Sequence, residues 1–420
     1  MLKVIPINDN IRLNYIPMDK LKTTSMGMYI HRKLKKEDAS KNAILPHILK
    51  RGCKLCSSSQ EIARYLENLY GAKFSAGIGK RGDDHLLCFE FETISDKYAP
   101  RGERLAAGVV KLMMSMVFGS LDEFDKDSFE QERANSITKI ENIINDKRIY
   151  ANYRCQEEMA RGDSFEIPRL GYVEDMKALT REEVYAYYKE IIVNSPIDIY
   201  VCGDANIREL EAEIRKGIEG FEFKKAEMPS CTILRRNSQV KNITEKLNVT
   251  QGKLSMGFLT DMKPTDENYF ALLVANAIFG GGAQSKLFNN VREKLSLAYY
   301  AGSILDKFKG IMMVNAGIEF DNFEKAYNEI MAQLDEMKKG NITDLELEAS
   351  KGFLINSLTS YYDDQHSMIS FYLNEKIGQT FADIDQCIER IKLVTKADAV
   401  DAMSDVKLDT VYFLTGREEQ

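Results

Sequence analysis

The stretch Ser25-Met26-Gly27-Met28 returns in the second half of the chain as Ser255-Met256-Gly257-Phe258. A polar loop and then a helix-like apolar run follow each copy, NAILPHIL from Asn42 in the first half and FALLVANAIF from Phe270 in the second. Repeated segments are the sequence signature of a duplicated structural unit. The two copies therefore predict a chain whose two halves are built alike.

A second pair of similar segments lies near the end of each half. VEDMKALTREEV begins at Val173 and IERIKLVTKADA at Ile388, and a strand-like run that ends in glycine follows each of them. Both pairs occur in the same order in the two halves, which favours a duplication. The mixed, charged stretch between the halves indicates a linker. We therefore expect homologous domains at residues 1–220 and 245–420, joined by residues 221–244.

Local patterns in the first half predict both helices and strands. The hydroxyl residues Ser57 to Ser59 are helix-capping signals, and the apolar residues after them recur at helical spacing. The turn-forming run Arg81 to Asp84 precedes HLLCFEFETI, whose alternating apolar residues indicate one strand of a hairpin. This pattern predicts an α+β fold with two homologous domains, each an antiparallel-rich sheet covered by helices. We expect the two domains to face each other as a clam shell.

Charge and hydropathy exclude several classes of protein. The chain has 57 lysine and arginine residues against 64 aspartate and glutamate residues, a net charge of −7. This balance disfavours a nucleic-acid surface, which requires a basic stripe. The first residues lack the apolar core of a signal peptide. No apolar run reaches the roughly 18 residues of a membrane span, so we expect a cytoplasmic protein.

The cysteines predict reduced thiols. Seven cysteines, an odd number scattered over the chain, form no disulfide framework. Cys53 and Cys56 make a CxxC pair, but neither the second pair of a zinc knuckle nor the βαβ context of a thioredoxin-like site accompanies it. We interpret these two residues as buried or idle thiols.

The segment AILPHILKRGCKLCSSSQEIARYLENLYGAKFSA, which begins at Ala43, resembles the first active-site segment of the insulinase/pitrilysin-like metallopeptidases. Nearly the whole chain is similar to the processing-peptidase-like branch of that superfamily. In the family, a helix carries His-x-x-Glu-His, in which the two histidines hold one zinc ion and the glutamate activates the zinc-bound water. A third ligand, a glutamate, comes from a later helix.

The zinc motif is degenerate in this sequence. Its first histidine falls on Ala43, its glutamate on Pro46, and only its last histidine on His47. The third ligand position falls near Thr138 or Lys139. Alanine and proline neither coordinate metal nor transfer a proton. No two histidines are four residues apart, since the chain has only His31, His47, His85 and His366. The resemblance therefore implies a chain that holds no zinc and cleaves no peptide by itself.

A later segment, FGGGAQSKLFNNVREKLSLAYYAGSI from Phe279, resembles a segment of the C-terminal domain in the same family. The family pattern of an arginine, six residues and a tyrosine falls on Arg292 and Tyr299. In active members this pair faces the zinc, binds the substrate backbone and stabilises charge on the scissile carbonyl. A guanidinium with several donors and a phenol with one suit that role. Alternatively, Arg292 pairs with a carboxylate and Tyr299 is an aromatic residue at the edge of the core.

Three glycines, Gly280, Gly281 and Gly282, stand just before this pair. Glycines let a backbone approach a ligand closely, and the resemblance implies a shortened form of a substrate-handling loop. Phosphate binding is disfavoured because the GxGxxG spacing and a βαβ unit are both absent.

Three functions stay open at this point. The first is a non-catalytic subunit of a heteromeric zinc metallopeptidase, which binds an extended peptide and supplies Arg292 and Tyr299 to a zinc-bearing partner of the same superfamily. The second is a structural or peptide-binding protein with no peptidase partner. The third is a self-sufficient enzyme with an unrecognised site. We favour the first because it explains the lost motif and the retained pair together. Zinc is then expected only on the partner.

Overall fold

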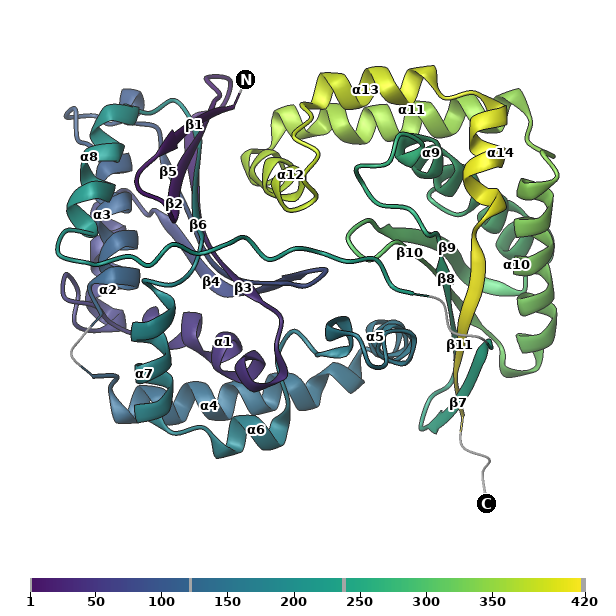
Figure 1. The fold of residues 1–420 in the computed structure, drawn as a ribbon, viewed down its shortest axis with the longest axis horizontal. Helices are drawn as coiled ribbons and strands as arrows, with labels where there is room; N and C mark the ends of the chain where they lie inside the picture. Colours follow the sequence, from purple (N-terminus) through teal and green to yellow (C-terminus); the bar gives the residue numbers. More distant parts are fainter. Residues whose placement is uncertain (1, 121–122, 236–238, 417–420) are drawn as a thin grey trace. The chain divides into compact units, whose positions relative to one another are not determined.

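The computed structural model describes residues 2–120, 123–235 and 239–416. These residues form two compact units, and each unit is built on one sheet with helices packed against it (Figure 1). Unit 1 takes its described residues from 1–141, 167–230 and 361–377. Unit 2 takes its described residues from 142–166, 231–360 and 378–420. The α+β class predicted from the sequence is confirmed.

Unit 1 contains a six-stranded mixed sheet. Its strands are β1 (Lys3–Pro6), β2 (Ile11–Pro17), β3 (Thr23–Lys33), β4 (Lys73–Arg81), β5 (Asp84–Ile94) and β6 (Ile197–Gly203). They lie in the order β1-β2-β6-β3-β5-β4, and β2 and β6 are the parallel neighbours in an otherwise antiparallel sheet. Arg81 lies opposite Asp84 in the β4–β5 ladder, so the hairpin turn falls where the sequence predicts it.

Unit 2 contains a five-stranded sheet. Its strands are β7 (Lys241–Leu247), β8 (Gly252–Leu259), β9 (Ala298–Asp306), β10 (Ile311–Ile318) and β11 (Lys407–Gly416). Their order is β7-β11-β8-β10-β9, and β7 and β11 are parallel. Without β1, the sheet of unit 1 reads β2-β6-β3-β5-β4, which is the same succession of first, fifth, second, fourth and third strand. This shared topology supports the duplication.

Several helices cover one face of each sheet, and a single helix lies on the opposite face (Figure 1). In unit 1 the covering helices are α1 (Lys36–Leu49), α2 (Ser59–Asn68), α3 (Leu105–Phe118), α4 (Lys126–Glu141), α6 (Val173–Ala178), α7 (Arg181–Ile191) and α8 (Ile207–Gly217). In unit 2 they are α9 (Tyr269–Phe279), the π-helix η4 (Leu287–Lys294), α10 (Phe323–Lys338), α11 (Asp344–Ser360), α13 (Ile384–Leu393) and α14 (Lys396–Ser404). The opposite faces are packed by α12 (Gln365–Ile377) in unit 1 and by α5 (Lys147–Met159) in unit 2.

The repeated segments fall on corresponding elements of the two units. The copies of Ser-Met-Gly lie within β3 and β8. The threonines of the second repeat, Thr180 and Thr395, begin α7 and α14. Each threonine side chain accepts from a backbone amide three residues later, and the side chain of that residue accepts in return, which forms a capping box. Similar sequence therefore produces the same local structure twice.

Two helices are exchanged between the chain halves. Helix α5 follows α4 in the first half of the sequence but packs on β8 and β11 of unit 2. Helix α12 comes from the second half and packs on β3 and β6 of unit 1. The sequence predicts continuous domains at 1–220 and 245–420, whereas each compact unit contains a piece of the other half. Periodicity shows that a helix is amphipathic but does not show which sheet it covers.

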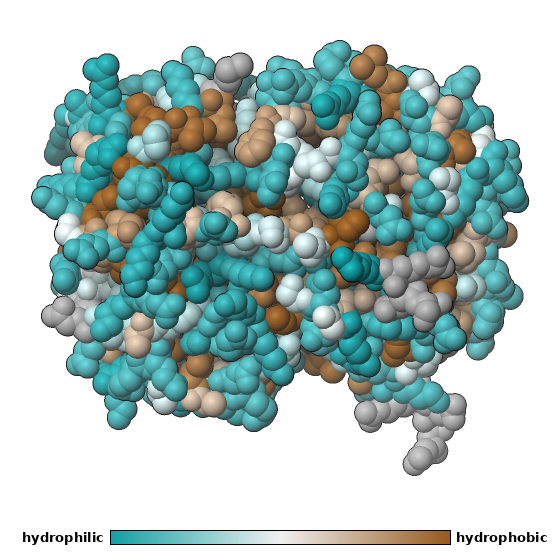
Figure 2. Space-filling model, in the orientation of Figure 1, coloured by the Kyte–Doolittle hydropathy of each residue, from teal (hydrophilic) through white to brown (hydrophobic). Residues whose placement is uncertain are grey.

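Alternation along β3 separates two environments in unit 1. Met26, Met28 and Ile30 belong to the core under the covering helices. Ser25 and His31 lie on the other face of the strand, the side packed by α12. That second face is buried but polar, so its side chains must find hydrogen-bond partners within the protein. Most of the molecular surface in view is hydrophilic, with small apolar groups between polar side chains (Figure 2).

Candidate functional site, a degenerate metal centre

Helix α1 carries the degenerate zinc motif. The helix runs through Pro46 without a break, and the amide of Lys50 donates to the Pro46 carbonyl at 3.3 Å. Ala43, one turn before His47, is 3% exposed and packs in the core of unit 1. The methyl group of Ala43 and the ring of Pro46 therefore stand where the family has a zinc ligand and a general base.

His47 faces the ammonium group of Lys139 on α4. The two nitrogens, Lys139 Nζ and His47 Nε2, are 3.4 Å apart, and the lysine donates. Burial, followed by the positive charges of Lys139 and Lys50, lowers the pKa of His47 to about 4. The Thr138 hydroxyl instead donates to the Ala134 carbonyl of its own helix. Of the two positions considered for the third ligand, Lys139 is therefore the one at His47.

These residues do not fit a zinc ion. A structural or catalytic zinc site needs at least three nitrogen, sulfur or oxygen ligands, and here one imidazole faces a cation. Glu132 is buried nearby on α4, but its carboxylate accepts from Arg51 Nε at 2.6 Å. In the described part of the chain, no group of three or more His, Cys, Asp or Glu residues is arranged to hold a metal. No catalytic step on this chain is therefore assigned to zinc.

The other histidines have structural partners. His85 Nδ1 lies 3.2 Å from the Asn42 side-chain nitrogen, and its Nε2 lies 2.9 Å from the Arg169 carbonyl. His366 Nε2 is 3.7 Å from the carboxylate of Glu92 at the surface of unit 1. Neither position resembles a relocated metal centre.

His31 belongs to a buried ionic cluster under α12. Its Nδ1 is 2.6 Å from Asp84 Oδ2, and its Nε2 is 3.1 Å from Asp198 Oδ2. Asp198 Oδ1 also accepts from Asn14 at 2.9 Å and from the ammonium of Lys376 on α12. Burial alone would lower the pKa of His31, but the two aspartates raise it to about 9. The sequence does not predict this cluster, because strand alternation marks a buried face without showing which residues meet on it.

Arg292 and Tyr299 lie in unit 2. Arg292 is in the last turn of η4, with its guanidinium 4.6 Å from the centre of the Phe288 ring and 3.5 Å from Glu293. Tyr299 is the second residue of β9, and its hydroxyl donates to Glu319, which raises the pKa of the phenol. The Arg292 side chain is 42% exposed and Tyr299 is 61% exposed. Both groups can thus reach another molecule.

The glycine run has a packing role at its first two positions. A Cβ at Gly280 would lie 2.5 Å from Ser303 Oγ, and one at Gly281 would lie 2.7 Å from the Cα of Ala277. The amide of Ser303 on β9 donates to the Gly280 carbonyl at 2.8 Å. Gly282 has more room, with the Phe353 ring 3.8 Å away from such a Cβ. Gly280 thus allows the end of α9 to approach β9, and Gly281 allows the chain to lie close against the last turn of α9. The sequence pattern does not reveal these packing roles.

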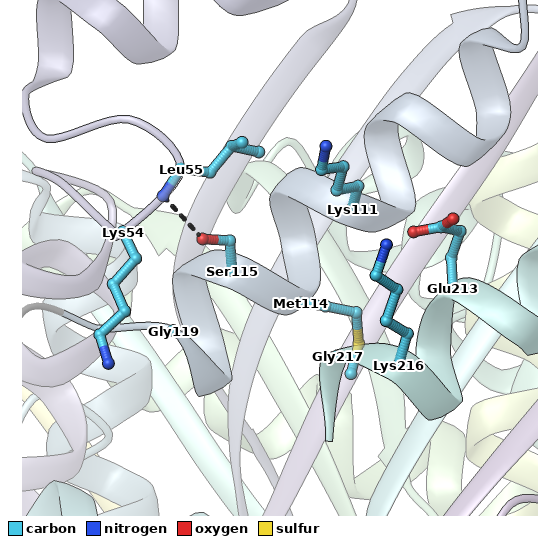
Figure 3. A pocket seen from close by; sticks show the side chains of 9 residues that line it. All are labelled: Lys54, Leu55, Lys111, Met114, Ser115, Gly119, Glu213, Lys216 and Gly217. Atoms are coloured by element: carbon cyan, nitrogen blue, oxygen red, sulfur yellow. Dashed lines mark hydrogen bonds between the residues drawn. The ribbon is translucent and has the colours of Figure 1, made fainter. Parts of the chain in front are cut away.

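A cavity of about 330 Å³ opens in unit 1 beside α3 and α8 (Figure 3). Lys111, Lys216 and Glu213 gather on one side of it, and Leu55 forms another part of its wall. None of the residues predicted from the zinc motif or the arginine–tyrosine pattern lines it. Sequence reasoning missed the cavity, because its walls come from three separate elements with no shared motif.

Comparisons with known proteins agree with this geometry. Residues 178–354 match the family described as the peptidase M16 inactive domain. A Bacillus subtilis protein named "Probable inactive metalloprotease YmfF" is 33% identical over 411 residues, covering 96% of this chain and 95% of that protein. The "Uncharacterized zinc protease YmxG" of the same species is 22% identical over 385 residues, covering 88% and 87%. The crystal structure of a conserved protein from Enterococcus faecalis has a TM-score of 0.91 at 28% identity, covering 100% of this chain and 99% of that chain.

The two-unit fold and the degenerate zinc helix define an inactive homologue of a zinc metallopeptidase. The chain belongs to the peptidase M16 family, the insulinase/pitrilysin-like superfamily that its sequence resembles. The prediction of an inactive member of that family is confirmed by the matches to its inactive members. Among the described residues, every helix is too short or too polar to span a bilayer.

Proposed function

We propose that this chain is the non-catalytic subunit of a heteromeric zinc metallopeptidase. It binds an extended peptide and supplies Arg292 and Tyr299 to the active site of a zinc-bearing partner from the same family. The observation that carries the proposal is a contrast within one chain. The zinc helix has Ala43 and Pro46 in place of a ligand and a base, whereas Arg292 and Tyr299 keep exposed donor groups.

The chemistry of the pair suits a peptide carbonyl. Water attack on a peptide bond places negative charge on the carbonyl oxygen, and hydrogen-bond donors stabilise that charge. The hydrogen bond from Tyr299 to Glu319 raises the pKa of the phenol, so the hydroxyl keeps its proton at neutral pH. The Arg292 guanidinium offers several hydrogen-bond donors in a fixed planar arrangement. Both side chains therefore carry donor groups, and Tyr299 would exchange its bond to Glu319 for one to the substrate carbonyl.

The position of Tyr299 also suits peptide binding. β9 is an edge strand of its sheet, and an extended peptide can add to such an edge through main-chain hydrogen bonds. The amide of Ser303 is already bonded to Gly280. A peptide would therefore pair along the part of β9 nearer Tyr299, with the glycine turn closing the other end.

The partner is expected to bring the metal and the general base. Bacillus subtilis has relatives with both kinds of name, an inactive metalloprotease and a zinc protease. We expect the host of this chain to encode a zinc-bearing relative with an intact His-x-x-Glu-His, and zinc to co-purify with that subunit alone.

The test is peptide cleavage by the reconstituted pair. Arg292→Ala and Tyr299→Phe should each lower the rate by about 10²–10³, the usual loss for one oxyanion donor. Arg292→Lys should also be impaired, because an ammonium does not reproduce the planar guanidinium fork. Lys294→Ala, on the same π-helix, is the matched control and should leave the rate unchanged.

Subunit association must be measured alongside cleavage. Neither side chain is proposed as an interface anchor, so the complex should form normally with every variant. Wild-type cleavage by an intact complex that carries both Arg292→Ala and Tyr299→Phe would reject the proposal. That result would favour a structural or peptide-binding protein without a catalytic contribution.

A further inference from the structure

The turn between α1 and α2 holds Cys53 and Cys56 opposite each other. The amide of Cys53 donates to the Cys56 carbonyl at 2.6 Å, and the amide of Cys56 donates back to the Cys53 carbonyl at 3.1 Å. Two residues that exchange both bonds have Cα atoms about 5.5 Å apart. Disulfide-bonded cysteines have Cα atoms roughly 4.4–6.8 Å apart. The backbone of this turn thus already has the spacing of a disulfide.

The neighbouring residues hold the turn in this geometry. A Cβ at Gly52 would lie 2.6 Å from the Ser57 carbonyl oxygen, so the chain on either side of the pair is also side by side. The middle of the turn is tied to the end of α3, where the amide of Lys54 donates to Gly119 at 2.8 Å and that of Leu55 to Ser115 Oγ at 3.1 Å. The cysteines therefore belong to a fixed two-residue hairpin.

We propose that Cys53 and Cys56 are a redox-active dithiol that closes to a disulfide within this turn. The oxidant is a low-molecular-weight disulfide. The thiolate of one cysteine attacks it, forms a mixed disulfide and releases one thiol. The second thiolate then attacks the mixed disulfide, forms the Cys53–Cys56 bond and releases the other thiol. The protein loses two protons and two electrons, and the oxidant is reduced to two thiols.

Burial controls the rate of this exchange. Both thiols are buried in the core of unit 1, and burial raises the pKa of Cys56. Since the thiolate is the attacking form, exchange is slow at neutral pH and faster in mild alkali. The same burial protects the product from reduction. Lys54 and Leu55, the two residues between the cysteines, line the cavity in Figure 3, so the disulfide would form in the turn that makes one of its walls.

The experiment compares the full-length chain, native and unfolded in urea, in mixtures of oxidised and reduced glutathione at pH 8.5. Thiols are quenched and alkylated before digestion with trypsin. Trypsin cuts after Lys54, between the two cysteines, so the disulfide leaves Gly52–Lys54 joined to Leu55–Arg64. The equilibrium constant for this disulfide should be at least about ten-fold larger in the native chain, because the fold raises the effective concentration of one thiol near the other. An equal or smaller constant in the native chain would overturn the proposal.

Two variants extend the test. Cys56→Ser should convert the product at Cys53 into a mixed disulfide with glutathione, whereas Cys88→Ser, on β5, should leave the linked peptide unchanged. A wild-type native chain that accumulates only mixed disulfides at Cys53 and Cys56 would also reject the proposal. The native–urea comparison uses the wild-type chain, so it stands even where a variant folds poorly.

Discussion

Two histidines of unit 1 have pKa values displaced in opposite directions, and their neighbours explain both. His31 lies between two buried carboxylates, and its pKa rises to about 9. His47 is half-buried beside the ammonium of Lys139, and its pKa falls to about 4. Burial disfavours the charged form of both rings. At His31 the two carboxylates outweigh burial, so the ring keeps its proton at neutral pH, whereas at His47 burial and the nearby positive charges act in the same direction.

The protonated state of His31 should make stability depend on pH. A histidine whose folded-state pKa is raised stabilises the fold fully below its unfolded pKa of about 6.5. That contribution is lost as the pH rises through the folded pKa, about 9. The free energy of unfolding should therefore fall between pH 6.5 and 9, by up to about 3 kcal/mol from this group. Urea unfolding across this pH range measures it.

A variant without the titrating ring isolates the effect. His31→Gln should be less stable than the wild type at pH 6.5, because Asp84 and Asp198 lose their positive partner. It should also lose most of the pH slope between 6.5 and 9. A slope equal to that of the wild type would show that other groups produce the pH dependence.

Lys139 should control the titration of His47. Removing the ammonium with Lys139→Met should raise the pKa of His47 towards its ordinary value, while the burial contribution remains. Lys139→Arg keeps the positive charge and should leave the pKa low. NMR titration of the imidazole signals reports the pKa directly. An unchanged pKa in the methionine variant would mean that burial alone lowers it.

At the scale of single elements, the sequence predicts local structure well and long-range partners poorly. The hairpin at Arg81 to Asp84 and the helix capped at Ser58 follow from turn and capping chemistry, which acts within a few residues. The degenerate positions Ala43 and Pro46 could be found because the zinc motif is local to one helix. The contact of Lys139 with His47 joins two helices, and helical register alone did not distinguish Lys139 from Thr138.

The contribution of the exchanged helix α12 to stability can be measured through its buried ion pair. Its Lys376 pairs with Asp198, whose side chain is 1% exposed. Lys376→Ala leaves the Asp198 charge with one fewer compensating cation, and breaking a buried pair in this way costs about 3–5 kcal/mol. Lys376→Arg should recover part of that loss. Urea unfolding gives the difference in free energy.

A surface lysine provides the matched control. Lys392 pairs with Glu389 three residues earlier on α13, and both side chains are more than half exposed. Exposed pairs contribute about 0–1 kcal/mol. Lys392→Ala should therefore cost far less than Lys376→Ala. Similar losses for the two variants would show that the buried cluster does not anchor α12.

At the scale of the whole chain, duplication and helix exchange act together. Each half of the sequence encodes a complete set of strands in the same sheet order. Each half also encodes the helix that covers the second face of the other half's sheet. The second face of the unit 1 sheet carries the buried ionic cluster under α12, and that of the unit 2 sheet packs apolar residues against α5. Each sheet therefore needs a helix from the other half of the chain to cover this face. The composition of the halves does not reveal this, because α5 and α12 are ordinary helices in sequence.

The exchange predicts that the two halves fold together better than alone. A fragment of residues 1–230 keeps His31, Asp84 and Asp198 but lacks α12, so its buried charges lose Lys376 and meet water. A fragment of residues 231–420 lacks α5, whose Ala151, Cys155 and Met159 pack in the apolar cluster on its sheet. Each fragment alone should show weak, poorly cooperative urea unfolding and bind a hydrophobic dye. Mixed fragments should form a 1:1 complex with a cooperative transition.

A second-half fragment in which residues 361–377 are replaced by a flexible linker should complement poorly, because it retains its own sheet but cannot cover the sheet of unit 1. If that fragment complements as well as the intact one, α12 is dispensable and the halves associate through other contacts.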